Sequence, residues 1–127
     1  FGNIGLMVCY DLRFPELALS LRAKGANLLT APSAFTYTTG EMHWQLLLQT
    51  RAMDSQCSVL GAAQQGWHGE KRQTWGHAAA TNSRGQLLNM IHADGAHLIT
   101  VDFDLSEQQK IRESMPLMQH RKLLQLS

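Results

Sequence analysis

The chain has 127 residues, 44% of them hydrophobic, and 11 basic against 10 acidic side chains give a formal charge of +1. That size and composition are typical of one globular domain or part of one. Binding to nucleic acid or to an anionic membrane needs clustered positive charge, and a bilayer span needs about 20 consecutive apolar residues, neither of which the sequence contains. Because Cys9 and Cys57 are too few for a disulfide scaffold, we expect a cytoplasmic protein with reduced thiols.

The chain begins without an initiator Met, and its first residues lead directly into an apolar run. This pattern favours a fragment cut at the edge of a strand. Residues 4–10 form the apolar run and predict a strand buried on both faces, as in the centre of a parallel sheet. No repeat, low-complexity tract or linker divides the sequence, so we expect one continuous piece of one fold.

A helix is predicted next, over residues 15–24. Pro15 suits its first turn, Glu16 suits its positive end and Gly25 is a natural stop. Residues 27–31 predict a second buried strand. A strand, a helix and a strand in succession predict a βαβ unit, so the two strands should be parallel.

The middle of the chain predicts a second crossover. Thr38 and Glu41 match a capping box that would open a helix over residues 41–56. Residues 57–63 then predict a third buried strand, and residues 64–74 predict a loop.

The last third of the chain predicts antiparallel hairpins and a final helix. Turn signals separate three further strands, expected at residues 77–81, 86–92 and 97–103. Asp104 or Ser106 is expected to cap a helix over 107–114, which Pro116 ends. The predicted fold class is therefore α/β, with parallel units that lead into antiparallel ones.

Cys9 is the first candidate for chemistry, because it lies where a buried strand gives way to a turn and a helix. Catalytic groups of α/β folds gather at the carboxyl edge of the sheet, and a thiol near a helix N-terminus is more easily ionised. The plain alternative is a small apolar residue that completes a core strand. Cys57 has no such turn beside it, and we interpret it as a core residue.

The run from Cys9 to Glu16, Cys-Tyr-Asp-Leu-Arg-Phe-Pro-Glu, closely resembles the nucleophile motif of the nitrilase superfamily. Further blocks follow in the order and spacing of its Nit-type branch, which includes the deaminated-glutathione amidases and ω-amidases: Pro32-Ser33-Ala34-Phe35, Thr39-Gly40-x-x-His43-Trp44, Arg51-Ala52-Met53, Ala62-Ala63-Gln64, Gly76-His77 and Met115-Pro116-x-x-x-His120-Arg121. The resemblance covers nearly the whole chain. It implies part of a four-layer αββα sandwich, with residues 1–127 as the C-terminal portion of a single carbon-nitrogen hydrolase domain.

The resemblance also implies a Glu–Lys–Cys triad without metal or cofactor. Cys9 takes the place of the nucleophile, and the backbone N–H of Tyr10 takes the place of an oxyanion donor. The family's Glu and Lys precede the nucleophile motif, and only eight residues precede Cys9 here. We therefore expect the 127 residues alone to lack amidase turnover.

Six residues are predicted to line the substrate site, with ordinary loop, packing or capping roles as the alternative: Arg13, Ser33, Ala34, Phe35, His43 and Trp44. Asp11, Arg13 and Glu16 are interpreted as structural charges of the turn between strand and helix, with the pocket wall as the second role of Arg13. Lys71 and Arg72 form either a solvated charge pair or an attractor for a carboxylate-bearing substrate.

Two other constellations use suitable residue types. A papain-like pairing of Cys9 with His77 and Asn82 is chemically reasonable, but nothing in the sequence fixes their proximity. A metal site drawn from Cys9, Cys57 and the histidines lacks the close ligand spacing of zinc sites.

The predicted function is hydrolysis of a small carboxylate-bearing amide, deaminated glutathione or a similar ω-amide, through a thioester on Cys9. The alternative is a catalytically silent nitrilase-like assembly module. A homodimer or higher homo-oligomer is implied, through the helices at 15–24 and 41–56. Ala78 stands where relatives often carry Ser after the Gly-His pair, which leaves the narrow substrate assignment open.

Overall fold

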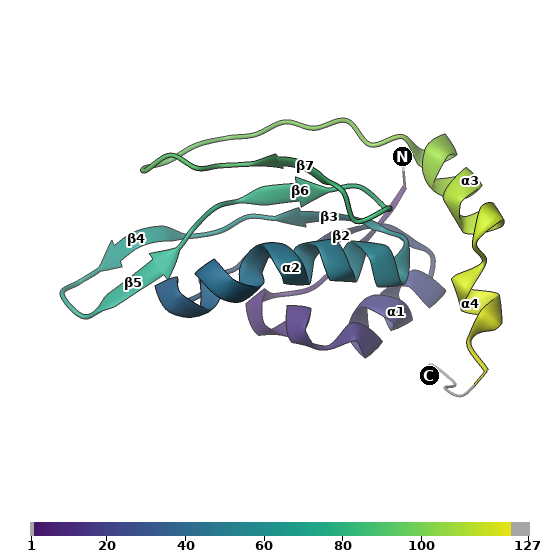
Figure 1. Cartoon of the computed structure of the whole chain (residues 1–127), viewed down its shortest axis with the longest axis horizontal. Helices are drawn as coiled ribbons and strands as arrows, with labels where there is room; N and C mark the ends of the chain where they lie inside the picture. The colour runs from purple at the N-terminus through teal and green to yellow at the C-terminus, as the bar shows by residue number, and fades with distance from the viewer. Residues whose placement is uncertain (1, 123–127) are drawn as a thin grey trace.

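The computed structural model describes residues 2–122 (Figure 1). Five strands form one sheet in the order β1-β2-β3-β6-β7, and β4 and β5 form a separate hairpin. The expected α/β fold class is confirmed. In chain order the elements are β1 (Asn3–Leu6), the 3-10 helix η1 (Cys9–Arg13), α1 (Pro15–Ala23), β2 (Ala26–Thr30), α2 (Tyr37–Ser55), β3 (Ser58–Gly61), β4 (Gln65–His68), β5 (Arg72–Trp75), β6 (Ala79–Thr81), β7 (Leu87–Met90), α3 (Leu105–Ser114) and α4 (Leu117–His120).

The first three strands of the sheet are parallel, as the βαβ pattern predicts. Right-handed crossovers place successive helices on the same face of a sheet when the strands are added in one direction. Figure 1 shows this arrangement, with α1 and α2 on one side of the sheet. Strands β6 and β7 extend the sheet in antiparallel fashion beyond β3, so the hairpin predicted there is confirmed.

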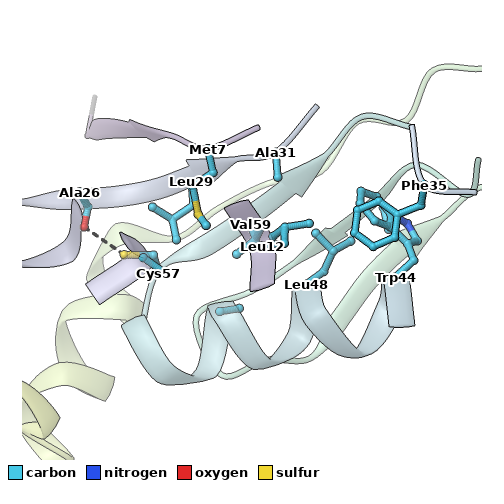
Figure 2. Close-up of a cluster of buried hydrophobic side chains, with 13 residues drawn as sticks. Met7, Leu12, Ala26, Leu29, Ala31, Phe35, Trp44, Leu48, Cys57 and Val59 are labelled. Carbon is cyan, nitrogen blue, oxygen red and sulfur yellow. Dashed lines mark hydrogen bonds between the residues drawn. The ribbon is translucent and has the colours of Figure 1, made fainter. Parts of the chain in front are cut away.

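The core lies between the sheet and α2 (Figure 2). Leu29 from β2, Val59 from β3 and Leu48 from α2 are fully buried. Burial of one such side chain contributes about 1.5–3 kcal/mol relative to leaving it exposed. The Trp44 ring lies over β3 at Gly61, where a Cβ atom would come within 2.6 Å of the ring. Helix and strand can approach this closely only because position 61 has no side chain.

The prediction for the first strand is wrong in two respects. The strand ends at Leu6 instead of residue 10, and it forms the edge of the five-stranded sheet instead of its centre. Gly5 faces α1, close to Leu21, whereas Ile4 and Leu6 point to the other face and are 52% and 73% exposed. The apolar run predicted burial on both faces, but within residues 2–122 only the helix side of β1 is closely packed.

The strand predicted at residues 97–103 does not form. Ile99, Val101 and Phe103 alternate as half-buried residues, which is the period of a strand. Within residues 2–122, however, the backbone of this segment makes no hydrogen bond. It crosses the sheet as an extended strap and leaves cavities of about 450 Å³ beside β1 and β2 and about 220 Å³ beside β3 and β6. The alternation of half-buried and exposed side chains was predicted correctly, but a β-strand also requires hydrogen bonds to a neighbouring strand.

The strands and helices also differ by one to three residues from the predicted bounds at several ends, and two segments differ more. Helix α2 begins at Tyr37 instead of residue 41, so Thr38 lies inside the helix and does not cap it. The predicted loop over 64–74 is instead the β4–β5 hairpin, with Gly69 in the left-handed region at its turn. The polar composition of this segment concealed its strands from a hydrophobicity pattern.

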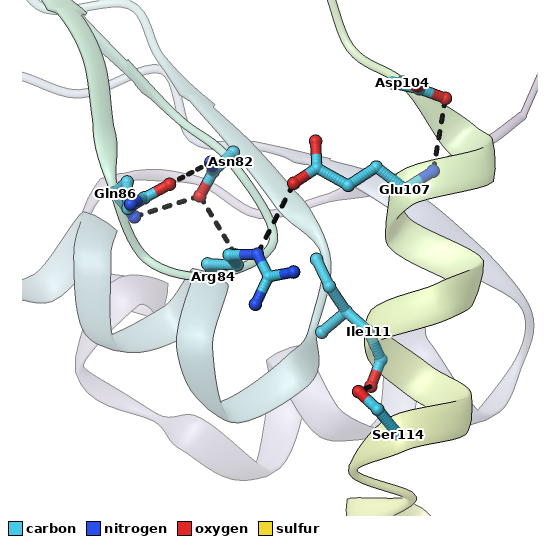
Figure 3. Close-up of polar contacts among 7 residues, drawn as sticks. All are labelled: Asn82, Arg84, Gln86, Asp104, Glu107, Ile111 and Ser114. Atoms are coloured by element: carbon cyan, nitrogen blue, oxygen red, sulfur yellow. Dashed lines mark hydrogen bonds and ion pairs between the residues drawn. The ribbon is translucent and has the colours of Figure 1, made fainter.

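Helix α3 is joined to the turn between β6 and β7 (Figure 3). The Asp104 carboxylate accepts hydrogen bonds from the backbone N–H groups of Ser106 and Glu107, which confirms the predicted cap. The Ser106 hydroxyl and these N–H groups lower the pKa of Asp104. Arg84 reaches Glu107 at 3.4 Å across the turn. Among the described residues, none of the helices has the length and apolar character needed to cross a bilayer.

Replacement of Gly61 by Ala is expected to destabilise the fold by about 1–3 kcal/mol, because the new methyl group would overlap the Trp44 ring. Urea unfolding measures the change. The matched control is Ala62→Ser, which also adds one atom but at an exposed position, and it should change the stability by less than about 0.5 kcal/mol. Equal stabilities for the two variants would show that the contact between Gly61 and Trp44 is not tight.

Candidate active site

Cys9 adopts a backbone conformation that is uncommon for a residue with a side chain. It is the first residue of η1, and its φ angle of 46° lies in the left-handed region. Such a residue costs on the order of 1–3 kcal/mol and persists only where the surroundings enforce it. Its N–H donates to the carbonyl of Pro32 at 2.9 Å, which continues the pairing of β1 with β2 beyond the end of both strands. A strained turn between strand and helix that presents a nucleophile is a known arrangement of hydrolases.

Side chains and backbone groups hold this turn from two directions. The Asp11 carboxylate accepts the N–H of Val8 at 2.9 Å, and the Asp11 N–H donates to the carbonyl of Val8. From α2, the Nε of buried Arg51 donates to the carbonyl of Leu12 at 2.8 Å. The N–H of Tyr10 has no acceptor within residues 2–122. The turn therefore has one backbone donor directly after Cys9 that remains free.

A cavity of about 450 Å³ opens beside the half-buried Cys9. The segments that follow β1, β2 and β3 form its wall, as expected where the carboxyl ends of parallel strands share one edge of a sheet. Two hydrogen bonds join the segments after β2 and β3, from Ser33 N–H to Ala62 O and from Gln64 N–H to Ser33 O, both at 2.9 Å, and the Cys9 bond to Pro32 joins the segment after β1 to them. Apart from Cys9 the wall has no titratable side chain; its residues are Val8, Cys9, Pro32, Ser33, Ala34, Ala62, Ala63 and Gln64.

Five of the six predicted substrate residues follow β2 or lie in α2, and only two of these five line the cavity. Ser33 and Ala34 do so, although the Ser33 hydroxyl donates to the carbonyl of Ala31. Phe35 packs edge-on against Trp44, with 5.3 Å between the ring centroids, and both residues are buried. The Trp44 indole donates to the carbonyl of His77 at 2.7 Å. Phe35 and Trp44 thus support the wall from behind.

Arg13 and His43 lie together outside the cavity wall. The guanidinium of Arg13 is 3.3 Å from the Nδ1 atom of His43. It is also placed 5.6 Å from the ring centroid of Tyr10 and 5.7 Å from that of Phe35. Contacts between a guanidinium and aromatic faces fix the orientation of the cation. The group therefore joins η1 to the start of α2, and its predicted contact with substrate remains a prediction.

Residues 1–113 match the family model described as carbon-nitrogen hydrolase. The chain belongs to the carbon-nitrogen hydrolase family. It is also similar to the Nit branch of the nitrilase superfamily. The crystal structure of Nit3 from Saccharomyces cerevisiae, a member of branch 10, covers 96% of the chain with a TM-score of 0.86 and 33% identity.

Curated relatives match almost all of the chain. The nitrilase and fragile histidine triad fusion protein NitFhit of Drosophila melanogaster is 50% identical over 121 residues, which are 95% of the chain and 26% of that protein. The deaminated glutathione amidase of Yersinia enterocolitica is 43% identical over 123 residues, which are 97% of the chain and 43% of that enzyme. The chain thus spans less than half the length of either relative, and it covers 45% of the Nit3 chain.

Some residues of the candidate site were not predicted individually. Ala62, Ala63 and Gln64 line the cavity, although the sequence analysis noted them only as a matching block. Since β3 was predicted to run parallel to β2, the residues after it could have been placed at the same edge as Cys9. The hydrogen bond of Arg51 with Leu12 could not be predicted, because the sequence of a helix does not show whether an arginine is buried or exposed.

The competing constellations are not assembled in this member of the family. The Nδ1 atom of His77 contacts the carbonyl of Trp75 at 2.7 Å, and Asn82 is engaged in the turn after β6. Neither residue lines the cavity beside Cys9. Among residues 2–122 no group of three or more His, Cys, Asp or Glu residues is placed to hold a metal ion.

Cys57 has the environment of a core residue, as predicted. Its side chain is fully buried, and the thiol donates to the carbonyl of Ala26 at 3.2 Å (Figure 2). Burial raises the pKa of this thiol, with smaller opposing contributions from the Ser55 hydrogen bond and the nearby charge of Arg112. A buried, protonated thiol is a poor nucleophile. The two cysteines therefore differ in access, because Cys57 is fully buried whereas Cys9 is half-buried beside a cavity.

Replacement of Arg51 by Met is expected to lower the free energy of unfolding by roughly 1–3 kcal/mol, because the buried carbonyl of Leu12 loses its donor. Met retains much of the apolar stem, so the change chiefly reports the polar contact. Asp54→Asn is the control, because it removes only the charge that pairs with Arg51. The Asp54 side chain is 37% exposed. It should cost less than about 1 kcal/mol. Equal losses in chemical denaturation would indicate that the ion pair, and not the Leu12 contact, stabilises the turn.

Proposed function

We propose that the protein containing this chain hydrolyses the carbon–nitrogen bond of a small carboxylate-bearing amide, with Cys9 as the nucleophile. The observation that carries the proposal is the placement of Cys9, strained and half-buried, beside a cavity where three strands end. Deaminated glutathione and similar ω-amides are the proposed substrates, since relatives of this chain are named deaminated glutathione amidase.

The proposed reaction has two halves. The Cys9 thiolate attacks the amide carbon, so a carbon–sulfur bond forms and the carbonyl electron pair moves to oxygen. The N–H of Tyr10, which directly follows Cys9, is proposed to donate to this oxyanion, and loss of one such donor typically costs about 3–4 kcal/mol. Collapse expels the nitrogen with an added proton as ammonia and leaves a thioester. Water then attacks the thioester, which releases a carboxylic acid and regenerates the thiol.

The base and the second oxyanion donor are proposed to come from outside residues 1–127, as a Glu and a Lys. Apart from Cys9, the described cavity wall has no titratable side chain, which supports this view. We accordingly propose that the chain is the C-terminal portion of one larger hydrolase domain. The exposed apolar side chains of Ile4 and Leu6 and the unpaired strap at 97–103 are consistent with further structure over that face. Two free thiols favour the cytoplasm.

A catalytically silent assembly module is the second candidate. One observation favours it, since the described part of the cavity contains a nucleophile without a base. The two candidates differ in the reactivity expected of Cys9, because only an enzyme needs an activated thiolate there.

The intact protein is expected to release ammonia from a carboxylate-bearing ω-amide, and Cys9→Ala should reduce kcat by at least about 10³-fold, because no thioester can form. Enzymatic ammonia determination measures the rate. Cys57→Ala is the matched control and should retain activity, since Cys57 lies in the core. Residues 1–127 alone should show no turnover.

Alkylation separates the enzyme from the silent module. Iodoacetamide should modify Cys9 of the native intact protein much faster than Cys57, with the sites assigned by peptide mass spectrometry. In denaturant both thiols should react. Equally slow modification of both thiols in the native protein, together with absent ammonia release, would reject the hydrolase proposal in favour of the assembly module.

A homo-oligomer is proposed as the functional state, with contacts through α1 and α2. Met42, Leu46 and Met53 lie along one stripe of α2 and are 54%, 63% and 54% exposed. Exposed apolar side chains arranged along a helix are typical of a protein–protein contact. This stripe lies on the far side of α2 from the sheet, because Trp44 and Leu48 face the core.

Leu46→Glu in the intact protein is expected to shift the oligomer to a smaller species, because a charge would be buried in the apolar contact. Light scattering after size-exclusion chromatography measures the mass. Gln109→Glu introduces the same charge on the exposed surface of α3 and should leave the mass unchanged. An unchanged mass for Leu46→Glu would exclude this stripe from the interface.

A further inference from the structure

The β4–β5 hairpin is bound to the segment after β2 at the end opposite its turn, through Thr74 and Trp75. Thr74 of β5 is fully buried and forms an antiparallel bridge with Thr36. The Trp75 N–H donates to the carbonyl of Phe35 at 3.0 Å. Trp75 also packs so closely on α2 that a Cβ atom at Gly40 would overlap it. These contacts are independent of charged side chains, and they fix β5 beside Phe35 and Thr36, which follow Ala34 of the cavity wall.

Arg72 projects from this strand toward the cavity wall. Residues two apart in a strand share a face, so Arg72 lies on the same side of β5 as Thr74. Its Nη2 atom donates to the carbonyl of Ala34 at 3.3 Å, and Ala34 lines the cavity beside Cys9. Arg72 is exposed and makes no ion pair within residues 2–122. A guanidinium has five N–H donors, and this contact uses only one of them.

The other cations near the site are placed differently. Arg13 is held between two aromatic rings and His43, and Arg51 is buried against Leu12 and Asp54. Lys71 lies at the turn of the hairpin and has no polar partner within the part of the chain that the structure describes. Arg72 is therefore the cation that combines a contact with the wall of the cavity and unused donors.

We propose that Arg72 binds the carboxylate of the substrate and so sets the preference for amides whose far end is anionic. This inference rests on the proposed function, which it extends by naming the residue that selects the substrate. A guanidinium and a carboxylate form two parallel hydrogen bonds, which position the ligand as well as attract it. Because β5 is held by Thr74 and Trp75, the Arg72 guanidinium is positioned more precisely than it would be on a free loop.

The test compares glutaramate with its methyl ester, two amides that differ only in the charge of the far end. In the intact protein, Arg72→Gln should lower kcat/KM for glutaramate about 10- to 100-fold, mainly through KM, and should leave the value for the ester nearly unchanged. Arg72→Lys should restore part of the loss, because a lysine retains the charge without the paired donors. Lys71→Gln is the matched control for loss of a neighbouring charge, and it should change either value less than threefold.

Binding of glutarate, measured by calorimetry, keeps the test independent of catalysis. Arg72→Gln should weaken this binding by a similar factor even if the protein hydrolyses no amide, a result that would reject the proposed function and retain the carboxylate site. Equal losses of kcat/KM for glutaramate and its ester would show that Arg72 only clamps the hairpin. That outcome would overturn the inference, and so would glutarate binding that is absent from the wild-type protein or unaffected by Arg72→Gln.

Discussion

The hydrogen bond from the Cys9 N–H to the carbonyl of Pro32 is the interaction on which the site depends. It continues the parallel pairing of β1 and β2 past the ends of both strands, at the point where Cys9 turns into the left-handed region. The bond anchors this left-handed residue to the segment after β2, so it helps to hold the strained turn. The strain, on the order of 1–3 kcal/mol, is offset by bonds that the sheet and α2 supply, including that of Arg51 with Leu12.

The two cysteines show how position in the fold decides chemistry. Both lie close to the end of a strand of the same sheet, but at opposite edges: Cys9 follows β1, whereas Cys57 precedes β3. At the carboxyl ends of parallel strands the following loops diverge, and here they leave a cavity. At the amino ends of β2 and β3, α3 covers the sheet instead, because Arg112 donates to the carbonyls of Ala26 and Gln56. One thiol therefore borders open space and the other is buried among carbonyl groups. This difference in position explains why Cys9, and not Cys57, is the candidate nucleophile of the two.

The sequence predicted the parts of the fold that depend on local pattern and on connection rules. The parallel arrangement of β1 and β2, the α1 helix and the Asp104 cap followed from apolar runs, Pro15 and cap chemistry, and they are confirmed. The edge position of β1 and the unpaired strap at 97–103 could not be predicted, because pairing depends on which neighbour is present and not on the strand itself. At the site, the placement of Cys9 followed from its motif. The contact of Arg72 with Ala34 did not, because it depends on a hairpin whose polar strands carry no hydrophobic signal.

The arrangement of both crossover helices on one face has a consequence for the behaviour of the polypeptide in isolation. Within residues 2–122, the opposite face presents apolar side chains, and β1 has no neighbouring strand along its outer edge. An open edge of this kind recruits strands from other molecules, and intermolecular sheets grow from it. In isolation, residues 2–122 would therefore be prone to intermolecular sheet formation at β1, and any structure that covers this edge and face would also contribute to solubility.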